Sequence, residues 1–286
     1  MSKANIVPQA NIKVIRSKQA EEVKFHKAVQ AYWEDPATIS IIDKNLHQLE
    51  IETVCRYLKS SDELVDIGCG DGKATLVYAQ KVKRCTAYER SNFLRKKALE
   101  EVKRSGLKNT TIKSGDILKM KKIPEKPDVV VTQRLLINLA SWSEQKEAIE
   151  NIHRMLKTGG IYIMIENTND AHQALNDMRH RVGLDPISIH WHNLYFDYEQ
   201  LMSYLKDKFQ LLDFQDFNLY LFLTRVYSQM FLSFTGHGRH AVKNSLFELS
   251  DKAAKDVFNE FNNLFQINGI RTLGPIQVFV LRKLNQ

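Results

Sequence analysis

Short apolar runs separated by longer amphipathic stretches dominate the middle of the chain. Apolar strands are expected at residues 63–67, 85–88, 110–114, 127–134 and 161–166. A helix over residues 143–156 is predicted by the helical spacing of Ala148, Ile149, Ile152, Met155 and Leu156. Two glycines, at positions 159 and 160, stop that helix before the next strand. This alternation of strand and helix predicts an α/β fold with a doubly wound, largely parallel sheet.

The turn after the first of these strands carries glycines at positions 68, 70 and 72. Glycine has no Cβ atom, so it accepts the positive φ angles of a sharp turn and lets a ligand lie against the backbone. The glycines alone are also compatible with an ordinary tight turn between a strand and a helix. Two acidic residues favour binding, because Glu89 ends the second strand and Asp116 follows the third. Strand ends in a doubly wound sheet meet at one crevice, so this spacing predicts a site for an adenosine-containing cofactor.

Residues 65–72, with the sequence Val-Asp-Ile-Gly-Cys-Gly-Asp-Gly, closely resemble the first motif of class I S-adenosylmethionine-dependent methyltransferases. The glycines fall at every second position, whereas dinucleotide-binding proteins have Gly-x-Gly-x-x-Gly. An acidic loop also suits the ammonium and sulfonium groups of S-adenosylmethionine better than it suits a phosphate. The resemblance implies that Glu89 holds the ribose hydroxyls and that Asp116, with the backbone of Ile117, reads the adenine edge. The residues expected to bind this cofactor are Tyr32, Asp66, Gly68, Cys69, Gly70, Glu89, Arg90, Asp116, Ile117 and Gln133.

The same resemblance implies a Rossmann-like sheet of seven mostly parallel strands with helices on both faces, one strand near the C-terminus being reversed. We expect an N-terminal arm and lid helix over residues 1–45 and a cofactor-binding core over 46–168. Residues 169–286 would add acceptor-cap insertions and the last strands. The cap is expected to be mainly helical over 169–200 and 219–275, with one helix at 250–265. Tyr32 and Trp33 are expected either to cover the methionine arm of the cofactor or simply to pack a docking helix.

Composition limits the possibilities without identifying a function. The 286 residues are 43% hydrophobic, which is enough for one large core. Cys55, Cys69 and Cys85 form neither a close pair nor a CxxC spacing, so we expect no disulfide framework and no metal site. This cysteine usage fits a reducing cytoplasm. The sequence offers no stretch of ~18 uninterrupted apolar residues, so no membrane span is expected.

The net charge of +8 is unevenly distributed, since much of the excess lies between residues 81 and 126. A basic segment is compatible with a nucleic-acid footprint, but surface helices and loops at this place favour a solvated face. Residues 133–139 also lack the Asn-Pro-Pro-Tyr type of motif used on flipped bases, and no Pro-Cys pair offers a nucleophile for a pyrimidine ring. We therefore expect a small acceptor rather than nucleic acid, and the positive field would favour an anionic one.

Residues 183–196 concentrate polar and aromatic side chains in a way that is unusual for a plain connector. His190 and His192 are candidates for a general base, because a histidine pKa suits proton removal near neutral pH. A capping loop with aromatic rings packed on the core would contain the same residue types. Arginines at 134, 179 and 225 are candidates for an anion clamp, although each alone is more often part of a structural ion pair. The candidate catalytic residues are His190, His192, Arg134, Asn138, Glu166, Asn167, Tyr195 and Arg225.

The acceptor half resembles a bacterial group of methyltransferase-domain proteins associated with capsule, lipopolysaccharide or other small-molecule pathways. The segments that carry this resemblance are residues 133–139, 166–168, 190–196, 223–226 and 277–283. It implies methyl transfer to a small-molecule or glycan-precursor acceptor, with O-methylation of a polar or anionic substrate as the expected reaction. Two other functions stay compatible with the sequence, an RNA methyltransferase and a cofactor-binding partner subunit without catalytic activity.

Overall fold

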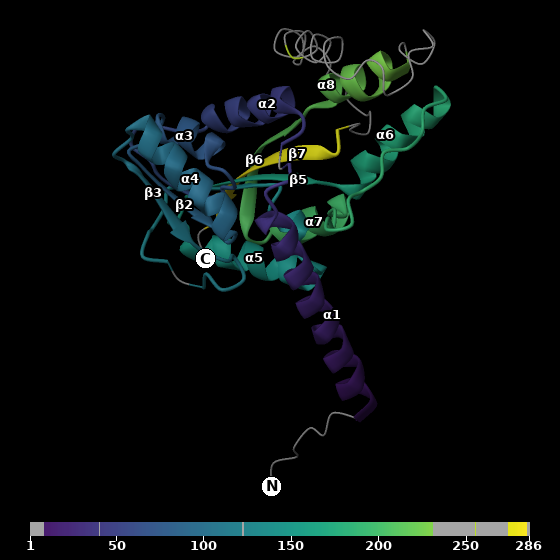
Figure 1. Ribbon diagram of the computed structural model, residues 1–286, viewed down its shortest axis with the longest axis horizontal. Helices are drawn as coiled ribbons and strands as arrows, with labels where there is room; N and C mark the ends of the chain where they lie inside the picture. Colours follow the sequence, from purple (N-terminus) through teal and green to yellow (C-terminus); the bar gives the residue numbers. More distant parts are fainter. Residues whose placement is uncertain (1–8, 40, 122, 231–254, 256–273, 285–286) are drawn as a thin grey trace.

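The computed structural model describes residues 9–39, 41–121, 123–230, 255 and 274–284. Seven strands form one sheet with helices on both faces (Figure 1). The strands are β1 (Glu63–Ile67), β2 (Arg84–Glu89), β3 (Thr110–Ser114), β4 (Val129–Gln133), β5 (Ile161–Asn167), β6 (Phe209–Asp216) and β7 (Ile276–Lys283). The α-helices are α1 (Gln9–Glu34), α2 (Lys44–Cys55), α3 (Lys73–Ala79), α4 (Asn92–Ser105), α5 (Trp142–Met155), α6 (Asn169–Arg181), α7 (Tyr198–Leu205) and α8 (Asn218–Phe222). A 3₁₀ turn spans Leu136–Asn138 and a π-helical turn spans Leu223–Tyr227.

The strand order is β3-β2-β1-β4-β5-β7-β6. Strands β1 to β5 pair in parallel, whereas β7 runs antiparallel to both β5 and β6. The expected mixed sheet with one reversed C-terminal strand is therefore confirmed. After β3 the chain crosses to the far side of β1, so the order of strands reverses between β1 and β4. In open α/β sheets the crevice at such a switch point, beyond the carboxyl ends of the strands, is where ligands bind.

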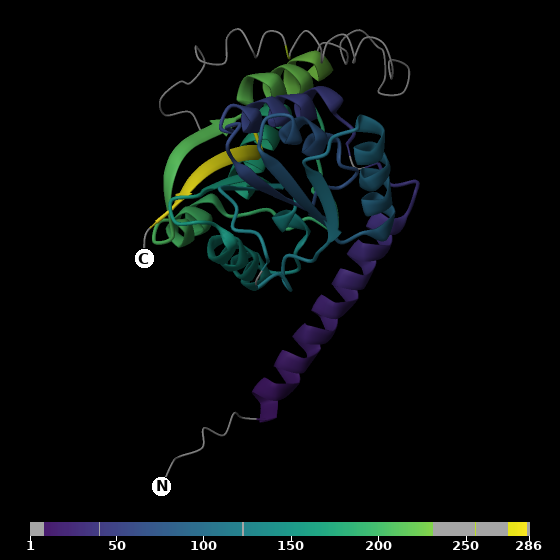
Figure 2. The ribbon, with the colours of Figure 1, turned by 90° about the vertical axis from the view of Figure 1, so that its left-hand side faces the viewer.

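The core has two layers because side chains alternate between the faces of each strand. In β1, Leu64 packs with residues of α2 and α3, whereas Val65 and Ile67 pack with residues of α5 on the other face. The two helical layers are visible on opposite sides of the sheet in Figure 2. The buried face of α5 includes Ile149 and Ile152, as its spacing predicted.

Helix α1 projects from the body at its N-terminal end, while its last turn is tied to the start of α4 (Figures 1 and 2). The carboxylate of Glu34 accepts the backbone N–H groups of Asn92 at 2.7 Å and Phe93 at 3.0 Å. The hydroxyl of Ser91, which caps α4, donates to the backbone carbonyl of Trp33 at 3.1 Å. The orphan N–H groups at a helix start favour such a carboxylate, so the lid helix has a fixed end beside the site.

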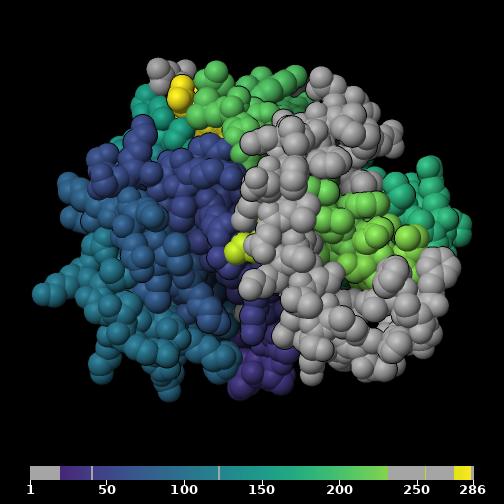
Figure 3. Space-filling view, turned by 90° about the horizontal axis from the view of Figure 1, so that it is seen from above, coloured from purple at the N-terminus to yellow at the C-terminus, as the bar shows by residue number. Residues whose placement is uncertain are grey.

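The cap segments are only partly helical where the structure describes them. Helix α6 ends where Gly183 adopts a φ of 74°, and residues 182–197 continue as a loop. Just after β5, Thr168 forms a bridge to Phe196 of this loop. Figure 3, seen from the side of α2 and α8, shows α2 and α3 in blue and the segment from β6 to α8 in green. The helix expected at 250–265 lies outside the described residues, apart from position 255. Among the described helices, none is long and apolar enough to cross a membrane.

Candidate active site

A cavity of about 390 Å³ lies at the switch point of the sheet, between the carboxyl ends of the strands and the end of α1. This volume is within the ~300–1,000 Å³ typical of ligand pockets. Every residue expected to bind the cofactor lines it: Tyr32, Asp66, Gly68, Cys69, Gly70, Glu89, Arg90, Asp116, Ile117 and Gln133. Segments far apart in the sequence therefore meet at one place.

The glycine loop presents bare backbone to this cavity. Gly68 and Gly70 have φ angles of 76° and 57°, a region that residues with a Cβ atom rarely adopt. A Cβ on Gly68 would lie 2.8 Å from Cδ1 of Leu135, whereas a Cβ on Gly70 would have nothing within 4 Å. Gly70 thus borders open space, as a residue that a ligand covers would.

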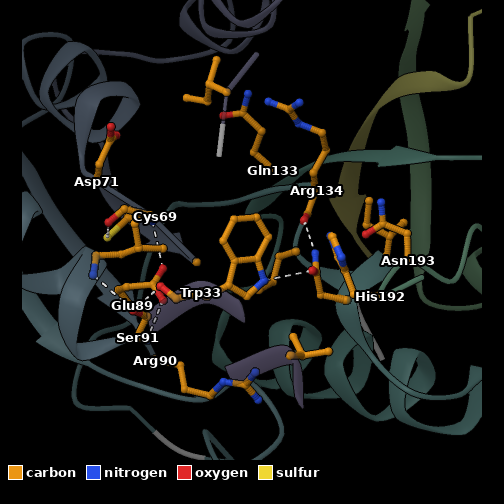
Figure 4. A pocket seen from close by; sticks show the side chains of 18 of the residues that line it. Trp33, Cys69, Asp71, Glu89, Arg90, Ser91, Gln133, Arg134, His192 and Asn193 are labelled. Carbon is orange, nitrogen blue, oxygen red and sulfur yellow. Dashed lines mark hydrogen bonds between the residues drawn. The ribbon is translucent and has the colours of Figure 1, made fainter. Parts of the chain in front are cut away.

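Glu89 at the end of β2 is held by the backbone of two neighbouring segments. Its carboxylate accepts the N–H of Gly70 at 2.9 Å and the N–H of Ser91 at 2.8 Å (Figure 4). Burial raises the pKa of Glu89, and the two backbone hydrogen bonds oppose that rise. A carboxylate has about four acceptor positions, so Glu89 can still bind hydroxyl groups from a ligand.

Asp66 lies one strand away and is buried within β1. The hydroxyl of Thr75 donates to its carboxylate at 2.6 Å. Burial raises the pKa of Asp66 to about 6, so the group is mostly ionised at pH 7. An ionised carboxylate in a buried site attracts a cationic group such as an ammonium.

The end of α1 covers the cavity with two aromatic rings. The indole Nε1–H of Trp33 donates to Oδ1 of Asn138 at 3.2 Å, and Nδ2 of Asn138 donates to the carbonyl of Arg134 at 2.8 Å. The ring of His192 lies 4.5 Å from that of Tyr32 and 5.6 Å from that of Trp33, measured between centroids. In Figure 4, Trp33 stands between Glu89 on one side and His192 on the other. Trp33 and Asn138 therefore join the lid helix to the loop after β4, and Tyr32 contacts the loop that carries His192.

The loop after β4 is fixed by the buried side chain of Glu166. Its carboxylate accepts three backbone N–H groups, those of Leu135 at 3.1 Å, Leu136 at 2.8 Å and Ile137 at 3.2 Å. Burial raises the pKa of Glu166 to about 8, against the pull of these three donors. Among the described residues other than glycine, only Arg134 has a positive φ, of 51°. Glu166 is not among the residues that line the cavity, so it acts on the site by holding the loop after β4 in place.

The two candidate histidines have different surroundings. His192 is buried and His190 is exposed, although both line the cavity and their rings stack 5.7 Å apart. Burial, together with the charge that His190 can carry, lowers the pKa of His192. Within the described part of the chain, Nδ1 of His192 has no hydrogen-bond partner. His192 is thus the better placed of the two to stay neutral and accept a proton.

The expected clamp of three arginines is not present. Arg179 is buried away from the cavity, where its guanidinium donates to the carbonyl of Asp185 at 2.9 Å and to the side chain of Gln229 at 2.8 Å. Asp185 lies on the loop after α6 and Gln229 follows the π-helical turn, so these partners come from separate segments that spacing along the sequence could not bring together. Arg179 therefore has a structural role and is not part of a clamp at the cavity.

The other two arginines do line the cavity, but each already pairs with a carboxylate. Arg134 donates to Glu50 at 3.1 Å, and Arg225 forms an ion pair with Asp43. Glu50 is fully buried and also contacts the Gln133 amide, with Nδ1 of His47 at 3.3 Å. Both carboxylates come from α2 or its N-cap residue, and neither was expected at the cavity from the sequence.

Asn138 lines the cavity, whereas Asn167 and Tyr195 are not among the described residues that line it. Asn167 is buried at the end of β5, and its carbonyl accepts the N–H of Phe196 at 2.9 Å. The ring of Tyr195 packs 5.4 Å from that of His172. Asn167 and Tyr195 therefore support the loop that carries His192, and the structure does not bring them to the cavity. The described residues contain no group of three or more His, Cys, Asp or Glu side chains that could hold a metal ion.

Comparison with known proteins gives a family match over the middle of the chain. The model of a family described as "Methyltransferase domain" matches residues 58–210. A demethylmenaquinone methyltransferase of Chlamydia felis (strain Fe/C-56) is 26% identical over 183 residues, covering 64% of this chain and 78% of that protein.

Solved structures share the fold at low sequence identity. The N-methyltransferase NodS of Bradyrhizobium japonicum WM9, in complex with S-adenosyl-L-homocysteine, has a TM-score of 0.52 and 13% identity, with 92% of this chain and 99% of that one covered. The [4+2]-cyclase SpnF has a TM-score of 0.53 and 19% identity, with 82% and 80% covered. Because a cyclase and an N-methyltransferase share this architecture, the fold alone does not define the reaction.

Proposed function

Since the chain belongs to the methyltransferase-domain family and is an S-adenosylmethionine-dependent methyltransferase, we propose that it methylates a hydroxyl oxygen of a small molecule, with His192 as general base. The observation that carries this proposal is the buried His192 ring between the lid helix and the cavity. Its pKa is lowered by burial, so the imidazole is neutral at pH 7. A neutral imidazole can accept the proton that a hydroxyl must lose.

The donor site follows from the strand ends. S-adenosylmethionine, when bound, supplies a methyl group on a sulfonium. Glu89 would accept hydrogen bonds from the ribose hydroxyls, and Asp116 with Ile117 would meet the adenine. Asp66 would attract the ammonium group, while Tyr32 and Trp33 would offer aromatic faces to the sulfonium. All of these residues line the cavity, which supports the proposal.

The acceptor would enter from the side of His192. His192 would take the proton of the acceptor hydroxyl as that oxygen receives the methyl group, and the donor would leave as S-adenosylhomocysteine. The lid residue Trp33, held by Asn138, keeps water away from this centre, and most of the rate gain would come from positioning and desolvation. Glu166 acts as a positioning residue through the loop that it fixes.

The anionic acceptor expected from the sequence loses much of its support. Arg134 and Arg225 are already paired with Glu50 and Asp43, so an anion would compete with a carboxylate for each guanidinium. The assignment to capsule, lipopolysaccharide or secondary metabolism, and the cytoplasmic location, stay predictions from the sequence.

The test is transfer of an isotopically labelled methyl group from S-adenosylmethionine to a pool of small metabolites, followed by mass spectrometry of the labelled product. We expect an O-methylated product. His192→Gln should lower kcat by about 10²–10⁴-fold without weakening S-adenosylhomocysteine binding. His180→Gln is the matched control and should change kcat little, because His180 is exposed on α6 and is not among the described residues that line the cavity. An N- or C-methylated product, or an unchanged kcat in His192→Gln, would contradict the proposal.

RNA methylation is a second candidate because of one observation. Residues 81–126 contain fifteen lysines and arginines but five acidic residues, whereas the whole chain carries a net charge of +8. In Figure 3 this segment, coloured blue to teal, forms one side of the molecule. Of its basic residues, only Arg90 is among the described residues that line the cavity. Labelling of RNA and a steep salt dependence of binding would favour this candidate, and failure of both would exclude it.

A further inference from the structure

The acceptor end of the cavity offers little unpaired charge. Arg134 is paired with the buried Glu50, and Arg225 is paired with Asp43. Asp43 also accepts the hydroxyl of Tyr220 at 2.8 Å and the N–H of Leu46 at 2.9 Å. These internal pairs leave the wall close to neutral, so a strongly charged acceptor would have to break them.

Besides polar residues such as His47, Asn138 and His192, this part of the lining contains many apolar side chains from several separate elements. Helix α1, the segment after it, helix α2, the loop after β4 and strand β7 each contribute aliphatic side chains. These are Val29, Ile39, Ile41, Ile42, Leu46, Leu135, Ile137, Leu139 and Ile276. Pockets for small molecules are typically apolar with a few polar groups that fix orientation, and His192 and Asn138 would be such groups here.

The lining continues outward onto exposed apolar side chains. Ile39 and Ile42 line the cavity, yet their exposed fractions are 69% and 80%. Trp191, next to His192, is 59% exposed and packs edge-on against Tyr32 of the lid helix. Single exposed apolar residues are common on proteins, but a group around one opening marks a binding surface.

We propose that the methyl acceptor is amphipathic: a hydroxyl-bearing head reaches His192, and an apolar ring or chain leaves the cavity over Ile39 and Ile42. This inference rests on the proposed function for the position of the head. It requires no charged group on the acceptor, because Arg134 and Arg225 are neutralised within the protein. The apolar part supplies the binding free energy, since each buried methylene raises affinity by up to about fourfold.

The test uses the full chain saturated with S-adenosylhomocysteine and a series of 4-alkylphenols from methyl to butyl. Calorimetry measures the affinity of each phenol. We expect affinity to rise about two- to fourfold with each added methylene. The double variant Ile39→Ser, Ile42→Ser should reduce that increment to less than half. Leu99→Ser is the matched control, because Leu99 on α4 is 47% exposed and does not line the cavity.

The outcomes separate this inference from the proposed function. Failure to bind S-adenosylhomocysteine would overturn the methyl-transfer scheme itself. Binding of S-adenosylhomocysteine without an affinity increment along the phenol series, or without binding of any phenol, would overturn only the amphipathic acceptor. The same conclusion would follow if the double variant kept the full increment. Thermal unfolding of the wild type and both variants checks that the exposed substitutions leave the fold intact.

Discussion

Gly70 and Gly106 form a matched pair that tests the glycine loop. Both have positive φ, 57° and 71°, and a Cβ on either would have nothing within 4 Å. Gly70 lines the cavity, whereas Gly106 ends α4 and is not among its lining residues. Alanine at a left-handed position costs about 1–2 kcal/mol, so both variants should lose similar stability, equivalent to roughly 2–4 °C in Tm.

Only Gly70→Ala should also weaken binding of the methyl donor and of its product S-adenosylhomocysteine. Its new methyl group would occupy space that the donor needs, and overpacking of this kind typically costs about 1–3 kcal/mol. That range corresponds to roughly 5- to 150-fold weaker binding of S-adenosylhomocysteine. Calorimetry measures the affinity, and thermal unfolding measures the stability of both variants. Wild-type affinity in Gly70→Ala, or an equal loss in Gly106→Ala, would refute the argument that the donor lies against this backbone.

Three further predictions follow from named contacts. Folding raises the Asp66 pKa to about 6. Between pH 4 and 6 this carboxyl is therefore protonated in the folded protein and ionised in the unfolded chain. The contribution of Asp66 to the free energy of unfolding should fall as pH rises through this window. Affinity for S-adenosylhomocysteine should rise over the same window as the carboxylate ionises. Folding also raises the pKa of Glu166 to about 8, so Asp66→Asn should keep part of the fall in the free energy of unfolding, but with a shallower slope than the wild type between pH 4 and 6, and should lose the rise in affinity. Trp33→Phe removes the hydrogen bond to Asn138 and should raise KM for the donor by about 3- to 10-fold, from a loss of roughly 1 kcal/mol; an unchanged KM would show that the bond does not hold the lid. Glu166→Gln leaves at least one of three backbone N–H groups unpaired and should lower the free energy of unfolding by about 1–3 kcal/mol in a denaturant titration, and a fully stable variant would contradict the positioning role.

The donor side of the cavity could be predicted from the sequence because its signals are local. The strand before Gly68, the glycine spacing and the acidic residue Glu89 at the end of β2 follow each other within about one βαβ unit. The order of these motifs also indicates the sheet in which they lie. All ten expected cofactor residues therefore line one cavity, although their individual roles stay predictions.

The acceptor side could be predicted only in part, because its contacts join distant segments. Glu50 looks like an ordinary helix carboxylate, yet it is buried by Arg134 and Gln133, more than 80 positions later in the chain. One signal was available: Glu50 lies one turn after Leu46 and one turn before Val54, both buried, so it occupies the apolar face of α2. A carboxylate on that face predicts a buried partner.

The arginines show that residue type alone does not place a side chain at a site. The sequence placed Arg179 with Arg134 and Arg225 on the basis of residue type, but a guanidinium binds backbone carbonyls as readily as it binds an anion. Arg179 donates to the carbonyl of Asp185 on the loop after α6 and to the side-chain oxygen of Gln229 after the π-helical turn. Only the tertiary structure could separate these alternatives.

The central claim is that the donor nucleoside lies across the ends of β1, β2 and the segment after β3. A crystal structure of the full chain with S-adenosylhomocysteine tests it most directly. We predict both ribose hydroxyls within hydrogen-bond distance of the Glu89 carboxylate, with the adenine beside Asp116 and Ile117. Density for the nucleoside elsewhere, with Glu89 still bonded only to the backbone of Gly70 and Ser91, would contradict the account.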